Sequence, residues 1–379
     1  MADERTEDGR MGRPAGAAGK EQGTGREKRW FACTFLAMAA ALCGLAGLTA
    51  WVDPFFHYHK PQAGLAYPIH NQRYMNDGIL RHFDYEAVIT GTSMTENFKA
   101  SDFERLWGVK TVKTPFSGGS YKEINDSLAR ILRKEKRVKY VVRCLDYSML
   151  LSDKDSMRYE HDFYPWYLYD DIPWNDVKYV LNKSVLFDNT LGVLKYTKDG
   201  GTTTDFDTYS NWNASYTFGK EPVLKGYTRP GESAEQEGLS MELKERIRGS
   251  LEQNVLSLAR ECPDTTFLVF FSPYSIVYWD SLKQSGTLRQ HIEAEREAIK
   301  ALAGQENIEL YSFSDCFELV CDLNNYKDMA HYSEAVNAMI LEWMHEGEHR
   351  ITAENYEAYL ESIEEFYFSY EYDAIFEGE

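Results

Sequence analysis

The sequence has few cysteines for its length and no excess of positive charge. Of its 379 residues, 41 are lysine or arginine and 60 are aspartate or glutamate, so the net charge is −19. Nucleic acid is therefore not expected as a partner, because phosphate binding needs a basic face. The six cysteines do not form a pattern typical of a disulfide scaffold. A disulfide between Cys316 and Cys321 is not favoured, since their offset does not place both side chains on one helix face.

Spacings of cysteine and histidine that would suggest a structural zinc site are also missing. We expect no metal and no cofactor. Aromatic residues, by contrast, make up 14% of the chain. Tyrosine and tryptophan in this amount often line surfaces that stack on sugars or other flat ligands, although they serve equally well in a core.

One apolar run, residues 30–52, is long enough to cross a membrane and carries no charged residue. About 20 apolar residues are needed to span the hydrocarbon core. Arg26, Lys28 and Arg29 precede the run, and Asp53 follows it. Because positive charge stays on the cytoplasmic side, we predict a single-pass membrane protein with a cytoplasmic N-terminus and all of the later chain outside.

A cleaved signal peptide is the alternative, because residues 48–50 (LTA) form a tolerable cleavage pattern. The apolar run is longer than the core of a signal peptide, and about thirty polar residues precede it. We therefore favour a retained anchor. Residues 1–29, rich in Gly, Ala, Arg and Glu, are predicted to form a disordered cytoplasmic tail, and residues 53–79 a juxtamembrane segment.

Beyond the anchor, short apolar runs alternate with amphipathic stretches, as is typical of a parallel α/β sheet with helices on both faces. Residues 80–348 are predicted to form this domain. The expected strands are 87–90, 110–115, 139–145, 266–271 and 308–312. The expected helices are 101–106, 122–134, 241–261 and 287–303.

Two regions interrupt this alternation. Residues 151–235 are too long for a connecting loop, and we predict a structured insertion or lid over the active site. Its aromatic residues would either stack on a sugar or pack the lid itself. Residues 349–379 are acidic and aromatic and are predicted to form a C-terminal helix.

One serine lies where such a sheet would place a nucleophile. In EAVITGTSMTENF, residues 86–98, an apolar strand ends at Thr90, Gly91 permits a tight turn, and Ser93 stands where a helix should begin. Open α/β sheets bind ligands at the carboxyl ends of their strands, and a helix N-terminus favours developing negative charge. An N-cap serine would occupy the same position, so Ser93 alone does not decide between the two interpretations.

A second pattern lies late in the chain, in NYKDMAHYSEAVNAMILEWM, residues 325–344. Asp328 and His331 precede an amphipathic helix, and His331 is the only one of nine histidines with an aspartate three residues before it. A serine nucleophile needs a base, and an imidazole base needs a carboxylate to fix its tautomer. An aspartate cap beside a surface histidine is the alternative interpretation.

Together the two patterns resemble the SGNH (GDSL-like) superfamily of hydrolases and acyltransferases, which has its serine after the first strand and Asp-x-x-His before the last helix. The similarity extends over roughly residues 80–345 by order of elements. The chain also looks like membrane-anchored members that modify cell-surface polymers. The resemblance implies a flavodoxin-like sheet of order 2-1-3-4-5, with Ser93 as nucleophile, His331 as general base and then acid, and Asp328 as its orienting partner.

An oxyanion hole is also implied by the resemblance, formed by the Ser93 amide and a glycine after the second strand. Gly118 and Gly119 of FSGGS lie at that place, and Gly118 is favoured. The asparagine that the family has after its third strand is not matched, because Asp146 and Tyr147 occupy this region. An ionised aspartate cannot donate a hydrogen bond, whereas Tyr147 could.

Three residues are candidates for contact with the substrate. Asn97 follows the serine by one helical turn, Asp146 follows the third strand, and Tyr274 lies in the segment that leaves the fourth strand. For Asn97, a solvated helix face is the stronger alternative.

These observations predict acyl transfer through a serine ester outside the cytoplasm, with a glycan hydroxyl (O-acyltransferase) or water (esterase) as acceptor. The expected partners are a cell-surface polysaccharide or other acylated polymer, a membrane protein that exports acyl groups, and the bilayer through residues 30–52. The alternative is a catalytically inactive SGNH-like subunit that binds polymer or assists a membrane acyltransferase. A metal phosphodiesterase would need a cluster of Asp and His that the strand ends lack.

Overall fold

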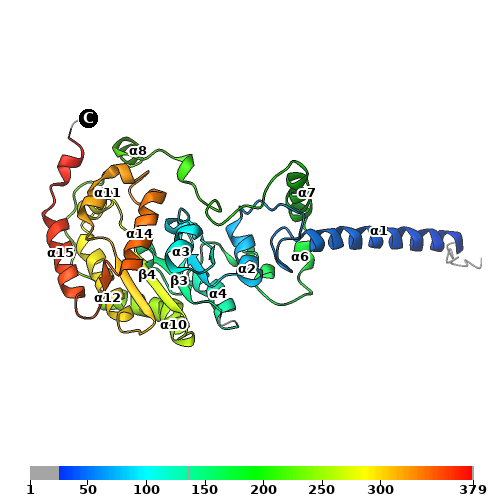
Figure 1. The fold of residues 1–379 in the computed structure, drawn as a ribbon, viewed down its shortest axis with the longest axis horizontal. Helices are drawn as coiled ribbons and strands as arrows, with labels where there is room; N and C mark the ends of the chain where they lie inside the picture. The colour runs from blue at the N-terminus through cyan, green and yellow to red at the C-terminus, as the bar shows by residue number, and fades with distance from the viewer. Residues whose placement is uncertain (1–24, 135–136, 378–379) are drawn as a thin grey trace, which may run out of the picture.

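The computed structural model describes residues 25–134 and 137–377. It begins with a long helix, α1 (Gly25–Val52), which projects from one end of the molecule (Figure 1). Among the described residues, α1 is the one helix that is long and apolar enough to cross a membrane. Most of the predicted N-terminal tail lies outside the described residues, but residues 25–29 belong to α1 and are therefore helical.

A six-stranded sheet forms the centre of the domain, in the order β2-β1-β3-β4-β5-β6. Strands β1 to β5 are parallel, and β6 pairs with β5 in the antiparallel sense. The predicted order of five strands is incomplete, because it lacks β6. The strands are β1 (Ala87–Thr90), β2 (Thr111–Lys113), β3 (Tyr140–Leu145), β4 (Thr266–Phe271), β5 (Ile308–Ser312) and β6 (Arg350–Ile351).

Helices cover both faces of the sheet, which explains why its strands are apolar on both sides (Figure 1). On one face α3 (Ala100–Trp107) packs against α14 (Glu334–Glu346). The other face carries α4 (Tyr121–Leu132), α9 (Met241–Leu251), α10 (Ser257–Glu261) and α12 (Leu288–Leu302). The predicted helix 241–261 is continuous, with a π-helical turn, η6 (Glu252–Leu256), between α9 and α10.

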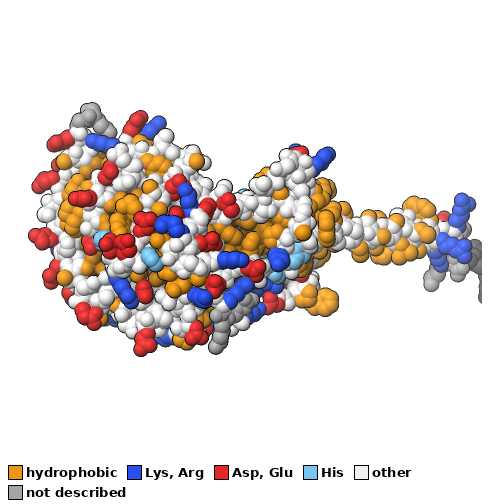
Figure 2. Space-filling model, in the orientation of Figure 1, with side chains coloured by type: hydrophobic (Ala, Val, Ile, Leu, Met, Phe, Trp, Pro, Cys, Tyr) orange, Lys and Arg blue, Asp and Glu red, His pale blue; other side chains and the backbone are white. Residues whose placement is uncertain are grey.

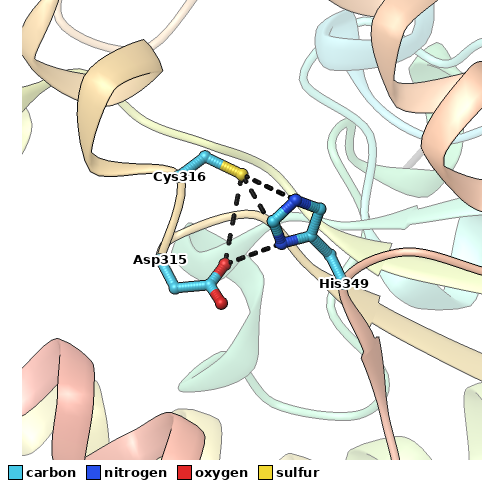
Figure 3. Close-up of side chains that lie close together, drawn as sticks. All are labelled: Asp315, Cys316 and His349. Atoms are coloured by element: carbon cyan, nitrogen blue, oxygen red, sulfur yellow. Dashed lines mark hydrogen bonds and ion pairs between the residues drawn. The ribbon is translucent and has the colours of Figure 1, made fainter.

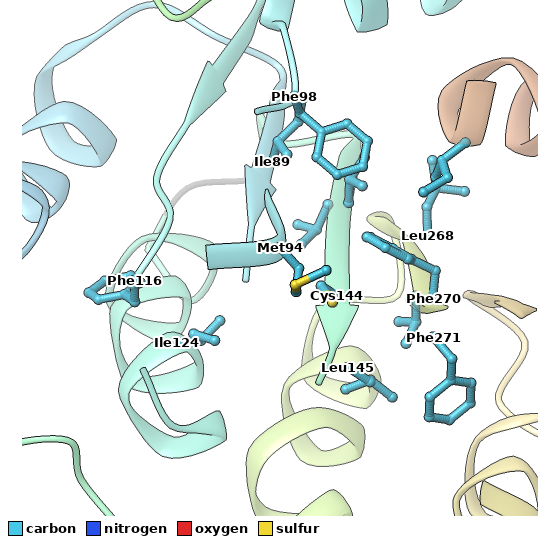
Figure 4. Close-up of a cluster of buried hydrophobic side chains, with 14 of the residues drawn as sticks. Ile89, Met94, Phe98, Phe116, Ile124, Cys144, Leu145, Leu268, Phe270 and Phe271 are labelled. Carbon is cyan, nitrogen blue, oxygen red and sulfur yellow. The ribbon is translucent and has the colours of Figure 1, made fainter. Parts of the chain in front are cut away.

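The core between β1, β3 and β4 is built from aliphatic and aromatic side chains (Figure 4). Phe98 meets Phe270 edge to face, with ring centroids 5.8 Å apart. Met94 and Cys144 are buried in the same cluster. The residues that follow the end of β1 are therefore anchored in the core, which fixes the position of Ser93 beside them.

Residues 151–235 form an insertion of turns and short helices. Its first part holds α6 (Val177–Val180), η4 (Val185–Thr190) and α7 (Leu191–Lys198), and both α6 and η4 contact α1. Its second part runs back along the sheet domain to α8 (Lys220–Lys225), where the Gly219 amide donates to the Tyr326 carbonyl over 3.0 Å. The insertion thus joins the end of α1 to the region around His331.

The C-terminal residues are part of the domain and not an appendage to it. Helix α15 (Tyr356–Ser369) packs on α12, and β6 extends the sheet. The ring of Tyr367 stacks on that of Trp279 with centroids 3.6 Å apart, and both side chains are fully buried. Trp279 lies on α11 (Ile276–Gln284), a helix that the sequence analysis did not predict. The remaining helices are α2 (Gln72–His82), α5 (Tyr147–Leu150) and α13 (Phe317–Cys321).

Candidate active site

Ser93 opens a short 3-10 helix, η1 (Ser93–Thr95), three residues after β1 ends. Thr92 caps this helix, because its hydroxyl accepts the Met94 amide and its carbonyl accepts the Thr95 hydroxyl over 2.9 Å. The buried side chain of Met94 holds the turn against the core. Ser93 is therefore presented at the carboxyl edge of the sheet, as predicted.

Gly91 is required in this turn because its surroundings leave no room for a side chain. A Cβ atom at this position would come within 2.6 Å of Thr95 Cγ2 and 2.9 Å of Cys144 Cβ. Those distances are shorter than carbon atoms tolerate, so any larger residue would displace the turn that carries Ser93.

Ser93, His331 and Asp328 form a chain of hydrogen bonds. Ser93 Oγ lies 2.8 Å from His331 Nε2. On the other side of the imidazole, Nδ1 lies 2.9 Å from Asp328 Oδ2 and 3.0 Å from Oδ1. An ionised carboxylate can only accept, so Nδ1 carries the proton and Nε2 is left as the acceptor for the serine hydroxyl. Residues more than 230 positions apart in the chain thus meet in the geometry of a serine triad.

Asp328 is held in place by the turn that it closes. Its Oδ1 accepts the amides of Ala330 and His331 at 2.9 and 2.8 Å. The carbonyl of Met329 accepts a hydrogen bond of 2.8 Å from the hydroxyl of Ser275, in the segment that follows β4. The segment after β4 therefore supports the turn that bears His331.

The charge of Asp328 is favoured by the same contacts. Burial by itself would raise the pKa of this carboxyl, but the hydrogen bonds from the His331 ring and from the amides of His331 and Ala330 outweigh burial and hold the pKa well below its usual range. Lys327 adds a positive charge 3.1 Å from Asp328 Oδ2. The carboxylate is thus ionised at neutral pH and orients the imidazole.

The two glycines expected to hold an oxyanion differ in what their amides do. The Gly119 amide donates to the Phe116 carbonyl over 2.7 Å, so it is already used within the turn. Gly118 has a left-handed backbone with φ of +59°, which suits glycine. A Cβ atom there would lie 3.4 Å from the guanidinium carbon of Arg158. We therefore retain Gly118 and the Ser93 amide as candidate donors and exclude Gly119.

Tyr147 does not serve as the missing oxyanion donor. Its hydroxyl lies 3.1 Å from Ser314 Oγ in a buried polar cluster, and its ring stacks on Phe271. The side chain is buried, and burial raises the pKa of its hydroxyl well above the ordinary value. The expectation was wrong because Tyr147 begins α5, and the helix turns its side chain into the core.

Asp146 lies directly beside the serine turn. Its Oδ2 accepts the Thr92 hydroxyl over 3.0 Å, and its Oδ1 caps α5 by accepting the Ser148 amide, also over 3.0 Å. A carboxylate therefore contacts Thr92, the residue before Ser93, at the place where the resemblance would require an asparagine. Tyr274 is buried under this carboxylate and against Tyr147, with ring centroids 5.4 Å apart, and so does not line a pocket.

Asn97 is a structural residue and does not face a substrate. Its carbonyl oxygen accepts the Trp212 amide over 3.1 Å, and its amide nitrogen donates to the Tyr332 carbonyl over 3.3 Å. The side chain is buried, so neither the substrate role nor the solvated helix face is correct. Asn97 instead ties the insertion and the His331 turn to the helix of the serine.

Trp212, which the sequence analysis did not single out, covers His331 from the insertion. The two rings meet edge to face with centroids 5.7 Å apart. The ammonium group of Lys327 lies 4.7 Å from the Trp212 ring centroid and 4.2 Å from that of Tyr216, a cation–π arrangement. The aromatic composition of the insertion, residues 151–235, was the feature of the sequence that pointed to this region, but it did not identify Trp212.

A surface cavity of about 550 Å³ lies beside the glycine turn. Gln72 and Arg73 line it, and both also bind Ser117, because Gln72 Oε1 accepts the Ser117 amide over 2.6 Å and Arg73 donates to its carbonyl over 3.1 Å. Tyr159 and Phe163 form the aromatic part of the wall. The cavity offers apolar and hydrogen-bonding surface, and its residues Gln72 and Arg73 contact Ser117, which precedes Gly118.

A second polar cluster lies at the far end of α14 from His331 and consists of Asp315, Cys316 and His349 (Figure 3). Asp315 Oδ1 lies 3.1 Å from His349 Nδ1, and Cys316 Sγ lies 3.7 and 3.5 Å from the two ring nitrogens. Burial raises the pKa of the Cys316 thiol, so the thiol stays protonated and unreactive. The three donors are one fewer than a structural zinc site uses, and Cys316 and Cys321 are both free thiols.

Comparison with known proteins adds no family assignment. The chain matches no protein-family model and no curated protein. The likeness to SGNH enzymes consequently rests on the positions of Ser93, Asp328 and His331 and on the sheet that places them.

Proposed function

We propose that the protein is an SGNH-type serine acyltransferase or esterase whose catalytic domain lies outside the cytoplasm. The observation that carries the proposal is the contact of 2.8 Å between Ser93 Oγ and His331 Nε2, with Asp328 bound to the opposite ring nitrogen. Such a chain lets the imidazole accept the serine proton as the new ester bond forms. A serine that only capped a helix would need neither partner.

In the proposed reaction, Ser93 Oγ attacks the carbonyl carbon of an acyl donor while its proton moves to His331 Nε2. The amides of Ser93 and Gly118 stabilise the negative charge on the carbonyl oxygen. His331 then gives the proton to the leaving oxygen, and an acyl-serine ester remains. An acceptor hydroxyl loses its proton to His331, attacks the ester and releases Ser93.

The acceptor is either water or a hydroxyl group of a cell-surface polysaccharide or similar polymer, and we favour the polymer. Water must attack an ester whose oxyanion is held by few donors, and the negative charge of Asp146, which contacts the neighbouring Thr92, further disfavours a developing negative charge. A bound sugar hydroxyl gains from being held in position, which offsets a weak oxyanion hole. Trp212 and the cavity beside Gly118 are the surfaces we assign to this acceptor and to the acyl chain.

The length and composition of α1 support the proposed placement at the membrane. The charges that flank its apolar run favour an N-terminus in the cytoplasm and a catalytic domain outside. This arrangement suits a donor that a second membrane protein delivers through the bilayer.

A fluorophosphonate probe tests covalent catalysis directly, because it esterifies only an activated serine. We expect full-length protein in detergent or membranes to be labelled, and Ser93→Ala to abolish labelling. Ser233→Ala is the matched control, since Ser233 also follows a Gly-x pattern but is exposed on the insertion. Labelling that persists in Ser93→Ala, or a folded wild type that never reacts, would overturn the proposal.

A catalytically inactive binding or accessory subunit is the second candidate, and Asp146 is the observation that favours it. A carboxylate bound to Thr92, the residue before Ser93, would oppose an oxyanion at this turn. This alternative predicts a folded, unreactive protein that still binds an acylated polymer, and binding unchanged in Ser93→Ala would support it.

A further inference from the structure

Exposed apolar side chains form a collar around the end of α1, in the first part of the insertion. Ribbon and surface views place α6 and α7 around the point where α1 leaves the domain, and hydrophobic side chains gather there (Figures 1 and 2). The collar consists of Ile172, Trp174, Val177, Leu181, Phe187 and Leu191. Trp174 is 87% exposed and Phe187 57%, although large apolar groups in water are costly.

The collar is fixed to α1 by buried polar contacts. The hydroxyl of Tyr179, on α6, donates to Asp53 Oδ1 over 2.7 Å and accepts the Phe55 amide over 3.2 Å. Asp176 accepts hydrogen bonds from the His57 ring at 3.2 Å and from the Tyr58 hydroxyl at 3.1 Å. These contacts therefore fix the position of the collar along the axis of α1.

Helix geometry places the collar at the level of the bilayer surface. About 20 residues cross the hydrocarbon core at 1.5 Å per residue, so a span that begins at Trp30 reaches Thr49. Thr49 and Val52 are fully buried, whereas the earlier part of α1 is exposed. The helix is thus covered by protein where it would leave the hydrocarbon, and the collar lies at that level.

We propose that the collar is a second membrane contact, inserted into the headgroup region of the leaflet from which the catalytic domain emerges. The inference rests on the proposal that α1 spans the membrane. Tryptophan is suited to this region because its ring is apolar and its N–H finds polar partners. Amphipathic helices that lie in the interface bury their apolar face about 5–10 Å deep in the lipid. The side chains of the collar, which no other described residues cover, could be buried in this way. The collar would give the catalytic domain a fixed orientation over the lipid.

Lipid quenching of tryptophan fluorescence tests the proposal on the full-length protein. The chain is reconstituted into phosphatidylcholine vesicles with and without bromine on the acyl chains near the headgroup, and the emission of Trp174 is obtained by subtracting that of Trp174→Phe. Trp51→Phe serves as the positive control, since Trp51 is 52% exposed on α1. Trp343→Phe is the negative control, because Trp343 packs at the opposite end of the domain against His349.

We expect brominated lipid to quench Trp174 at least half as strongly as Trp51 and to leave Trp343 unchanged. Quenching of Trp174 by aqueous iodide instead would mean that the collar is free in water, and the proposal would be wrong. Protection from both quenchers would assign the collar to a protein partner or a second copy, which also overturns it. If Trp51 itself escapes the lipid quencher, the membrane span fails, and this outcome differs from failure of the collar alone.

Discussion

The ring of Trp212 meets the imidazole of His331 edge to face, at 5.7 Å between centroids, although the two residues come from different parts of the chain. Trp212 belongs to the insertion, whereas His331 belongs to the last turn before α14. The contact means that the insertion covers the proposed base and sets what can approach it. The His331 side chain remains 26% exposed, so the insertion restricts the access of solvent and ligands to the imidazole without blocking it.

Removal of the Trp212 ring should increase access of water to the acyl-serine ester. We expect Trp212→Ala to raise the rate of hydrolysis of a small activated ester, whereas Trp212→Phe, which keeps an aromatic edge, should behave like the wild type. Steady-state release of p-nitrophenol measures this directly. A loss of activity in Trp212→Ala comparable to that of Ser93→Ala would show instead that the ring holds His331 in position.

Replacement of Asp146 by asparagine should strengthen the proposed oxyanion hole. The change removes a negative charge beside the serine turn and adds an N–H donor there, and one such donor is worth about 100-fold in rate in a well-formed site. We expect Asp146→Asn to increase fluorophosphonate labelling by at least about tenfold. Asparagine can still cap α5, so the fold is retained.

Asp146→Ala separates charge from hydrogen bonding in the same experiment. It removes the carboxylate but adds no donor, so we expect a smaller gain than with asparagine. Slower labelling in both variants would contradict the assignment and would indicate that the carboxylate is needed to hold Thr92.

A methyl group at Gly91 should disrupt the serine turn. Its Cβ would lie 2.6 Å from Thr95 Cγ2, and overpacking of this kind costs about 1–3 kcal/mol. We expect Gly91→Ala to lower the melting temperature and to abolish labelling of Ser93. Gly304→Ala is the control, because a Cβ there meets nothing within 4 Å. Unchanged labelling in Gly91→Ala would show that the turn adapts.

Lys113 should make stability depend on pH. Its ammonium group is buried under the serine turn and donates to the carbonyls of Glu96 and Phe98 at 2.6 and 2.8 Å. Burial lowers its pKa to about 7, below the ordinary value of 10.5. Because the unfolded chain binds this proton more tightly, the destabilisation is complete below pH 7 and is relieved as pH rises toward the unfolded pKa.

Lys113→Met removes this dependence and provides the comparison. Between pH 6 and pH 9 we expect the free energy of unfolding of the wild type to rise relative to the variant, by an amount on the order of 2 kcal/mol, since one pKa unit corresponds to about 1.4 kcal/mol. Denaturant unfolding in detergent at the two pH values measures the difference. If the difference in the free energy of unfolding between wild type and Lys113→Met is the same at both pH values, Lys113 keeps its ordinary affinity for the proton.

The sequence predicted those features that depend on local pattern. Strand β1 and the turn at Ser93 follow from an apolar run and a glycine, and the Asp328–His331 spacing follows from one turn of chain. Strand β6 was missed because it is only two residues long and exists through its pairing with β5. No periodicity marks so short an element.

Side-chain direction was the part that local pattern did not predict. The role assigned to Tyr147 failed because the phase of α5 points the ring into the core, and the role of Asn97 failed because Trp212 binds it from the insertion. Both outcomes depend on packing between segments that are distant in the chain. Trp212 was missed for the same reason.

The joint between α1 and the domain has a mechanical consequence. Asp53, with a left-handed φ of 49°, accepts the amides of His57, Tyr58 and His59, and the backbone of Phe55 and Phe56 rests against Gly78 of α2. These contacts leave no flexible segment between α1 and the domain. A tilt of α1 therefore rotates the whole domain with it. For an α1 that spans a bilayer as proposed, the inclination of this helix would set the height of Ser93 above the lipid. The proposed enzyme would then reach different acceptor hydroxyl groups in bilayers of different thickness.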